Sequence, residues 1–147
     1  MPDGDEREQV LDRATSLALL RSVAVGRVAW ATDSGEAVVL PVNFAVDGDD
    51  VLFRTAAGAK LDAVRSGRII SFEADDLEPG LHLGWSVMVS GPAEVVAEED
   101  QDSLDQVPLP WDRAPKPFLV RLHVSRVGGR QLPLRPGGVT FERQNGG

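Results

Sequence analysis

Residues 37–55 read AVVLPVNFAVDGDDVLFRT, and their pattern decides the fold class. An apolar run over 37–46 is followed by the turn-forming residues DGDD at 47–50, and a second apolar run over 51–55 comes directly after them. Two short apolar runs joined by Asp and Gly are typical of an antiparallel β-hairpin. The stretch therefore predicts two paired strands.

Further segments of strand length lie on both sides of this hairpin. We expect strands over 27–32, 68–74, 85–96 and 118–127, with a bend at Gly91 and Pro92, and helices over 11–23 and 56–66. An acidic helical turn over 98–106 and an extended linker with four prolines should precede the last strand. Six short strands with few helices predict a mostly β fold, either an antiparallel barrel or a sandwich, with short helices at its ends.

The 147 residues fit a single domain. Residues 1–10 are predicted to form a flexible acidic leader, 11–132 the folded domain, and 133–147 a poorly ordered tail. Two of the expected strands, at 37–40 and 85–89, are apolar on both faces, whereas an antiparallel strand usually keeps one polar face. A second buried surface is therefore expected, most simply a homodimer interface.

Composition excludes several classes of function. The net charge of −8 repels nucleic acid and anionic lipid, so we expect no nucleic-acid or membrane partner. The chain has no cysteine, and its two histidines are far apart in sequence, so no metal site is expected. The acidic, polar start resembles no signal peptide, and no apolar run has the length of a membrane span, so a soluble cytoplasmic protein is predicted.

One stretch, residues 54–68, is locally basic in this acidic chain. In it the strand ends in Arg54 and Thr55, a turn of small residues contains Gly58, and Lys60 lies near the first turn of the expected helix. A phosphate monoester is bound by such groups: cationic side chains, a hydroxyl and the N–H groups at a helix start, with glycine allowing close approach. The stretch predicts either a phosphate site or a surface turn with solvated basic residues.

Polar groups also interrupt two apolar strands. Asn43 follows Pro41 and Val42, and a buried amide there must bond either to neighbouring backbone or to the polar edge of a bound heterocycle. Trp85 and Ser86 begin another strand. A tryptophan at such a place is more often part of the core or of an interface than a ring-stacking partner.

Five short motifs occur in a fixed order along the chain. They are Val25-Gly26-Arg27-Val28-Ala29, Pro41-Val42-Asn43-Phe44, Phe53-Arg54-Thr55 with Gly58 and Lys60, Phe72-Glu73, and Gly84-Trp85-Ser86-Val87 with Gly91. In this order the sequence resembles the pyridoxamine 5′-phosphate oxidase-like FMN-binding split-barrel superfamily over residues 11–130. It is most similar to the short actinobacterial-type members that are grouped with nitroimidazole-resistance proteins.

The resemblance implies a six-stranded antiparallel split β-barrel that forms a homodimer and binds FMN between the protomers. It assigns three groups of cofactor-binding residues: Phe53, Arg54, Thr55, Gly58 and Lys60 at the phosphate and ribityl chain; Pro41, Val42 and Asn43 along the isoalloxazine ring; and Trp85 and Ser86 on a strand near the cofactor that the partner protomer could contribute.

The implied function is flavin-dependent oxidoreduction of a small molecule, with unassigned catalytic residues. True pyridoxamine phosphate oxidases place substrate-binding residues in a longer C-terminal region, so oxidation of that vitamin is not expected here. Many nitroimidazole-resistance members carry a histidine where this chain has Thr55-Ala56-Ala57. The alternatives are a reductase that uses the deazaflavin coenzyme, a non-catalytic module that binds flavin or haem, and a barrel without a cofactor; haem would require His82 or His123 to face the cleft.

Overall fold

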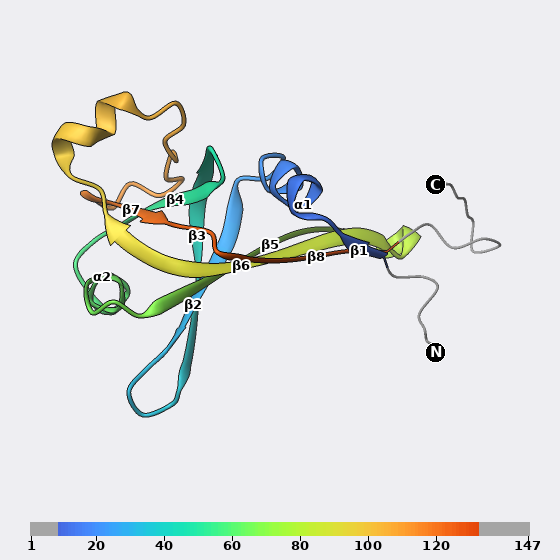
Figure 1. Ribbon diagram of the computed structural model, residues 1–147, viewed down its shortest axis with the longest axis horizontal. Helices are drawn as coiled ribbons and strands as arrows, with labels where there is room; N and C mark the ends of the chain where they lie inside the picture. The colour runs from blue at the N-terminus through green and yellow to red at the C-terminus, as the bar shows by residue number, and fades with distance from the viewer. Residues whose placement is uncertain (1–8, 133–147) are drawn as a thin grey trace.

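The computed structural model describes residues 9–132, which form an antiparallel β-structure with short helices (Figure 1). The strands are β1 (Gln9–Leu11), β2 (Val25–Ala31), β3 (Ala37–Asp47), β4 (Asp50–Thr55), β5 (Ile69–Glu78), β6 (Leu83–Val95), β7 (Phe118–Leu122) and β8 (Arg126–Leu132). The helices are α1 (Arg13–Leu20) and α2 (Ala59–Arg65), with 3-10 helices η1 (Pro79–Leu81) and η2 (Glu98–Ser103). Residues 1–8 of the predicted leader (1–10) and the predicted tail over 133–147 lie outside the described residues, whereas residues 9 and 10 belong to β1 and so to the folded domain.

Six of the strands close a barrel in the order β6, β5, β2, β3, β4, β7 and back to β6. The two extra strands extend the sheet from the edge of β6 that β7 also occupies, opposite β5: β8 pairs with β6, and β1 pairs with β8. The predicted six-stranded antiparallel barrel is therefore confirmed, and the sandwich is excluded. None of the described helices has the length and apolarity needed to span a bilayer.

The barrel splits at Gly91, where β6 changes its partner. Residues 84–90 of β6 pair with β8, and residues 93–95 pair with β7. The chain between β7 and β8 passes directly over Gly91, so that a Cβ atom built there would lie 1.8 Å from the carbonyl oxygen of His123. Only glycine allows this approach, and the bend expected at Gly91 and Pro92 coincides with the change of partner.

The single strand predicted over 118–127 is wrong, because two strands occupy this stretch. β7 ends at Leu122 and β8 begins at Arg126. Between them, the N–H of His123 donates to Pro92 O (2.9 Å) and the N–H of Ser125 donates to Ser90 O (3.0 Å). Because Ser90 O and Pro92 O are two residues apart on β6, both bonds lie on the same edge, so the chain continues along this edge of β6 with an irregular step over residues 123–125.

The predicted helices are shorter than expected at both places. Leu11 belongs to β1, which pairs with β8, so α1 begins only at Arg13. Asp12 is its N-cap and accepts a hydrogen bond from Thr15 N (2.8 Å). The second helix, predicted from residue 56, begins at Ala59 because Gly58 before it has a φ of 149°.

The core fills the barrel and continues under α1. Strand residues alternate between buried and partly exposed positions, and Phe44 meets Phe72 edge to face with ring centroids 4.6 Å apart. Leu17 and Leu20 of α1 join the same cluster from above β6 and β8 (Figure 1). The part of β5, β6 and β8 that α1 covers is bare on its other side.

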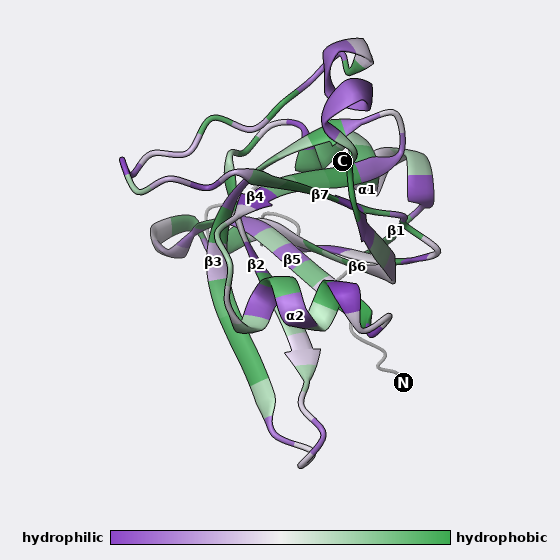
Figure 2. Cartoon of the chain, turned by 90° about the vertical axis from the view of Figure 1, so that its left-hand side faces the viewer, coloured by the Kyte–Doolittle hydropathy of each residue, from purple (hydrophilic) through white to green (hydrophobic). Residues whose placement is uncertain are grey.

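This bare side, which we call the outer face, carries apolar and charged residues together. Its register places Val39 beside Ala29, and Met88 beside Glu73. Val39 is 59% exposed and Met88 is 57% exposed. Figure 2 shows the apolar stretch of β3 running beyond the barrel, along the arm that β3 forms with β2. The strands that read as apolar on both faces thus do present a second apolar surface.

Candidate functional site

A small cavity of about 50 Å³ brings together half of the predicted site residues. It is lined by Pro41, Val42 and Asn43 of β3, Arg54 of β4, Lys60 of α2, and Pro110, Asp112 and Lys116 of the connection between β6 and β7. We call it the Arg54 cavity. Residues that are far apart in sequence therefore surround one space, and three of them are cationic.

Arg54 reaches this cavity because successive side chains of β4 point to opposite faces of the strand. Phe53 and Thr55 point into the barrel and are buried, whereas Arg54 between them points outward and is half-buried. Its Nη2 donates to Oε1 of Gln101 in η2 (3.4 Å), and Nε2 of Gln101 donates to Val96 O (3.3 Å). The acidic helical turn expected over 98–106 thus contributes the residue that orients the guanidinium.

Two lysines and one aspartate also line the cavity. Nζ of Lys116 lies 2.6 Å from Oδ1 and 2.8 Å from Oδ2 of Asp112. Burial lowers the pKa of Lys60, and the charge of Lys116 lowers it further, while Asp112 acts in the opposite direction. The hydrogen bond from Lys116 lowers the pKa of Asp112. With Arg54, the ionised side chains carry a net charge of about +2 in the cavity wall.

The connection between β6 and β7 is fastened along the outer side of β3. The N–H of Trp111 donates to Asn43 Oδ1 (2.8 Å), and the N–H of Asp105 donates to Asp47 Oδ1 (3.3 Å). The proline-rich segment predicted as a linker is therefore a wall of the Arg54 cavity. Sequence reasoning missed Asp112 and Lys116, because no local spacing relates them to Arg54 or Lys60.

β3 has an open edge beside this cavity. Among the described strands, β3 pairs only with β2 over 37–43 and only with β4 over 44–47. The N–H of Phe44 points toward β2, since it donates to Ala24 O (3.1 Å). Successive residues of a strand alternate in direction, so the N–H and C=O of Asn43 point away from β2, to the open edge. Pro41 lies on the same edge and has no N–H to leave unpaired there.

Three other predicted site residues do not line the cavity. Phe53 is fully buried in the core. Thr55 is 3% exposed, and its hydroxyl donates to Ala56 O (2.9 Å). Gly58 was expected to allow close approach of a phosphate, and a Cβ built on it would point into open space, with no protein atom beyond its chain neighbours within 4 Å. Its φ of 149°, which L side chains rarely adopt, is what requires glycine at this position.

Trp85 and Ser86 lie apart from the Arg54 cavity. They line a separate cavity of about 90 Å³ with residues of β5 and β8. β2 and β5 stand between β3 and β6, so at about 4.8 Å per strand the two places are about 14 Å apart. A single chain therefore does not bring Trp85 and Ser86 to Arg54.

The rest of the basic stretch has structural roles. The guanidinium of Arg65 lies 5.0 Å from the ring centre of Phe118. Arg68 donates to Ala31 O (3.0 Å) and forms an ion pair with Asp33. The local cationic excess in the sequence thus divides into two residues at the cavity and two that hold neighbouring elements.

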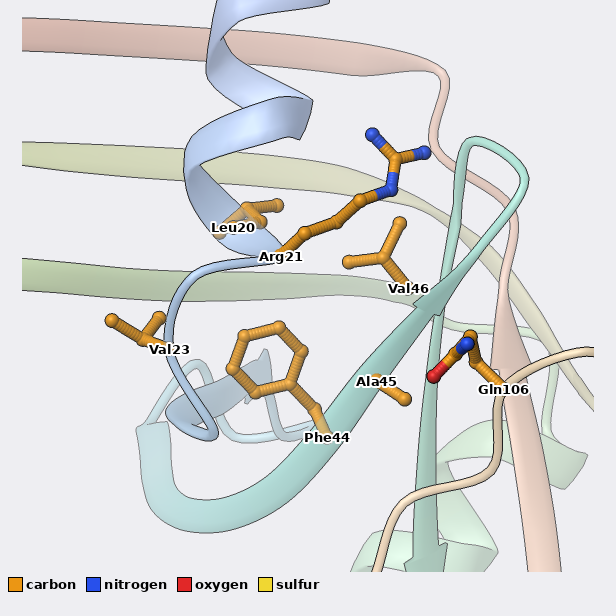
Figure 3. A pocket seen from close by; sticks show the side chains of 7 residues that line it. All are labelled: Leu20, Arg21, Val23, Phe44, Ala45, Val46 and Gln106. Atoms are coloured by element: carbon orange, nitrogen blue, oxygen red, sulfur yellow. The ribbon is translucent and has the colours of Figure 1, made fainter.

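A second, larger cavity of about 370 Å³ lies between the end of α1 and β3 (Figure 3). It is lined by Leu20, Arg21, Val23, Phe44, Ala45, Val46 and Gln106. Arg21 is its one charged side chain and donates to Gly48 O. Neither histidine borders this cavity or the Arg54 cavity: His82 follows η1, and His123 lies between Asp50 and Glu94. Within the described part of the chain, the walls of these two cavities therefore contain no histidine.

Comparison with known proteins places this architecture among described families. Residues 12–131 match the family model described as pyridoxamine 5′-phosphate oxidase. The uncharacterized protein Rv0080 of Mycobacterium tuberculosis is 41% identical over 128 residues, which cover 83% of this chain and 84% of that protein.

Two solved structures agree in fold and in sequence. A Corynebacterium glutamicum protein, assigned provisionally to the pyridoxamine 5′-phosphate oxidases, is 33% identical with a TM-score of 0.74, covering 89% of this chain and 97% of that one. A Mycobacterium smegmatis protein described as FAD binding is 32% identical with a TM-score of 0.65, covering 85% and 98%.

Proposed function

The chain belongs to the pyridoxamine 5′-phosphate oxidase family, and we propose that it binds FMN and uses it for oxidoreduction of a small molecule. The observation that carries the proposal is the Arg54 cavity, where the predicted residues of β3, Arg54 and Lys60 meet. Arg54 and Lys60 belong to one motif of the sequence and the residues of β3 to another, and all of them line one cavity, which supports the proposal.

The donor set of the cavity fits a phosphate monoester. Arg54 and Lys60 supply charge-assisted hydrogen bonds, and the wall has a net charge of about +2, which matches the charge of about −2 on a phosphate monoester near neutral pH. Arg54 is held in place by Gln101 before any ligand arrives. Preorganised cations of this kind bind an anion without paying for their own ordering.

The isoalloxazine ring needs a different place, since a volume of about 50 Å³ is far below the roughly 300–1,000 Å³ of pockets for drug-sized ligands. The open edge of β3 at Pro41 and Asn43 adjoins the cavity and offers backbone donors and acceptors to the polar rim of a ring. We propose that a second copy of the chain covers the ring there, and that its Trp85 and Ser86 complete the site. The distance of these two residues from Arg54 within one chain supports this arrangement.

In this proposal the cofactor and the residues of the chain have different roles. A bound flavin supplies hydride or electron transfer. The residues of this chain hold the phosphate through Arg54 and Lys60, and they orient the ring along β3. No side chain of the cavity is an obvious general base, because Lys116 and Asp112 are engaged with each other.

FAD is the second candidate for the cofactor. The M. smegmatis protein, 32% identical, is described as FAD binding. FAD and the deazaflavin coenzyme both carry larger anionic groups than FMN does. One cavity of about 50 Å³ with two predicted phosphate-binding cations favours a single phosphate group.

Purification tests the proposal directly. We expect a yellow protein with the flavin absorbance near 450 nm that releases FMN on denaturation, identified by its mass. Release of FAD or of the deazaflavin coenzyme would replace FMN in the proposal. A colourless protein that also leaves the fluorescence of added FMN unchanged would refute flavin binding.

Replacement of the two cations locates the phosphate. Arg54→Ala and Lys60→Ala should each weaken FMN binding at least about tenfold in a fluorescence titration, because a charge-assisted bond contributes about 1.5–3 kcal/mol. Arg65→Ala is the matched control, since Arg65 belongs to the same basic stretch but packs on Phe118. Equal losses in all three variants would mean that the effect is one of general charge.

A further inference from the structure

We propose that Asp112 is an internal counter-ion that occupies the phosphate position, and that an arriving phosphate displaces it and takes Lys116 as a third cationic ligand. The inference rests on the proposed flavin binding and adds to it a residue that holds the ligand and a residue that competes with it. Together they make the site selective for a dianion.

The geometry of the pair places both groups at the ligand position. Lys116 and Asp112 line the Arg54 cavity together with Arg54 and Lys60. Both carboxylate oxygens of Asp112 lie within 2.8 Å of Lys116 Nζ, and the charge of Lys60 also acts on this carboxylate. An oxyanion of the protein is thus bound by one of the three cations of this cavity and attracted by a second.

The two partners differ in how firmly they are held. The side chain of Lys116 is 23% exposed, and that of Asp112 is 64% exposed. Pro115 and Pro117 flank Lys116 and restrict its backbone. Asp112 Oδ1 also accepts from Ala114 N (3.1 Å), so one local bond and the ion pair are lost when this exposed carboxylate turns into solvent, while the less exposed Lys116 stays in the wall.

Selectivity follows from the competition. A singly charged anion that replaces the carboxylate of Asp112 gains little, because it exchanges one negative charge for another. A phosphate dianion interacts with three cations through more oxygens and can displace the carboxylate. The internal pair therefore lowers the affinity for all anions and raises the preference for a dianion.

The experiment compares FMN with riboflavin, which lacks the phosphate, in fluorescence titrations of three variants. Lys116→Met should weaken FMN binding about tenfold, and Asp112→Asn should strengthen it about fivefold, as expected for a charge-assisted bond and an exposed ion pair. Riboflavin affinity should stay unchanged in both variants. Asp49→Asn, which removes one negative charge at the exposed tip of the β3–β4 hairpin, should change neither ligand's affinity.

The outcomes separate this inference from the function on which it rests. Asn at position 112 keeps an oxygen that can accept from Ala114 N (3.1 Å), so the turn is preserved, and circular dichroism checks the fold. Equal changes for FMN and riboflavin, or none, would overturn the inference while flavin binding stands. Failure of the unmodified protein to bind FMN would overturn both. A weaker affinity of Asp112→Asn for FMN would make Asp112 a ligand and not a competitor.

Discussion

At the scale of single residues, Glu73 on the outer face makes folding stability depend on pH. Its pKa is raised to about 7, first by burial and then by the hydrogen bond and charge of Asp75; Arg27, 2.9 Å away, acts in the opposite direction but does not prevail. Between the ordinary value of 4.5 and about 7, the folded protein therefore holds a proton that the unfolded chain has released. Stability should fall as pH rises through this window and level off above it.

Solvent screening at the partly exposed Glu73 side chain limits how much stability changes with pH. A shift of this size corresponds to about 3 kcal/mol, but 33% of the side chain is exposed, so we expect a loss of about 1 kcal/mol between pH 5 and pH 8. Urea unfolding of Glu73→Gln should show less dependence on pH than the unmodified protein. Glu36→Gln, in the exposed turn between β2 and β3, should keep the full dependence. A stability that rises from pH 5 to pH 8 only when Glu73 is present would contradict the assignment.

The residues of the candidate site show what a sequence can and cannot predict. Arg54 and Lys60 were predictable because a strand end and a helix start six residues apart create their proximity locally. Asp112 and Lys116 were not, because tertiary hydrogen bonds such as that between Trp111 and Asn43 bring their segment to the site. Thr55 was expected to face the ligand, yet the alternation of β4 turns it into the barrel.

At the scale of elements, Gly91 lets β6 serve two partners. Gly91→Ala would place its Cβ 1.8 Å from a backbone oxygen between β7 and β8, where no side-chain rotation can relieve the clash. We expect a loss of at least about 2 kcal/mol of stability, measured by thermal or urea unfolding. Gly80→Ala is the control, since its nearest neighbour is the end of the flexible Glu78 side chain at 3.3 Å. Similar losses of stability in both variants would show that the contact between position 91 and His123 O is not the cause.

The close passage of the chain over Gly91 also explains why the strand predicted over 118–127 was wrong. Residues 118–127 read FLVRLHVSRV, and nothing local in this run marks a boundary. The break arises because His123 N–H donates to Pro92 O and Ser125 N–H donates to Ser90 O, the residues that follow and precede Gly91. This pairing is a property of the closed barrel. The hairpin over 37–55, in contrast, was predictable because its turn residues and apolar runs are adjacent in sequence.

At the scale of the whole molecule, the outer face has the character of an interface. Val39, Ile69 and Met88 are each more than half exposed there, and the charges of Arg27 and Glu73 lie among them. A flavin ring on the open edge of β3 would also need cover from a second chain. Both requirements are met if two copies pack through this face, with an interface of about 1,200–2,000 Å² in total.

Met88→Asp tests this assembly. Met88 is 57% exposed in the single chain, so the substitution should leave the fold intact. In a dimer it would bury a carboxylate next to Glu73, its cross-strand neighbour, at a cost of several kcal/mol. Light scattering should therefore give twice the chain mass for the unmodified protein and a single chain mass for the variant. The variant should also bind FMN more weakly, because loss of the dimer removes the cover from the ring. Leu109→Asp, at an 80% exposed position on the β6–β7 connection, should leave the mass at twice that of the chain. A monomeric unmodified protein that binds FMN tightly would place the whole flavin site within one chain.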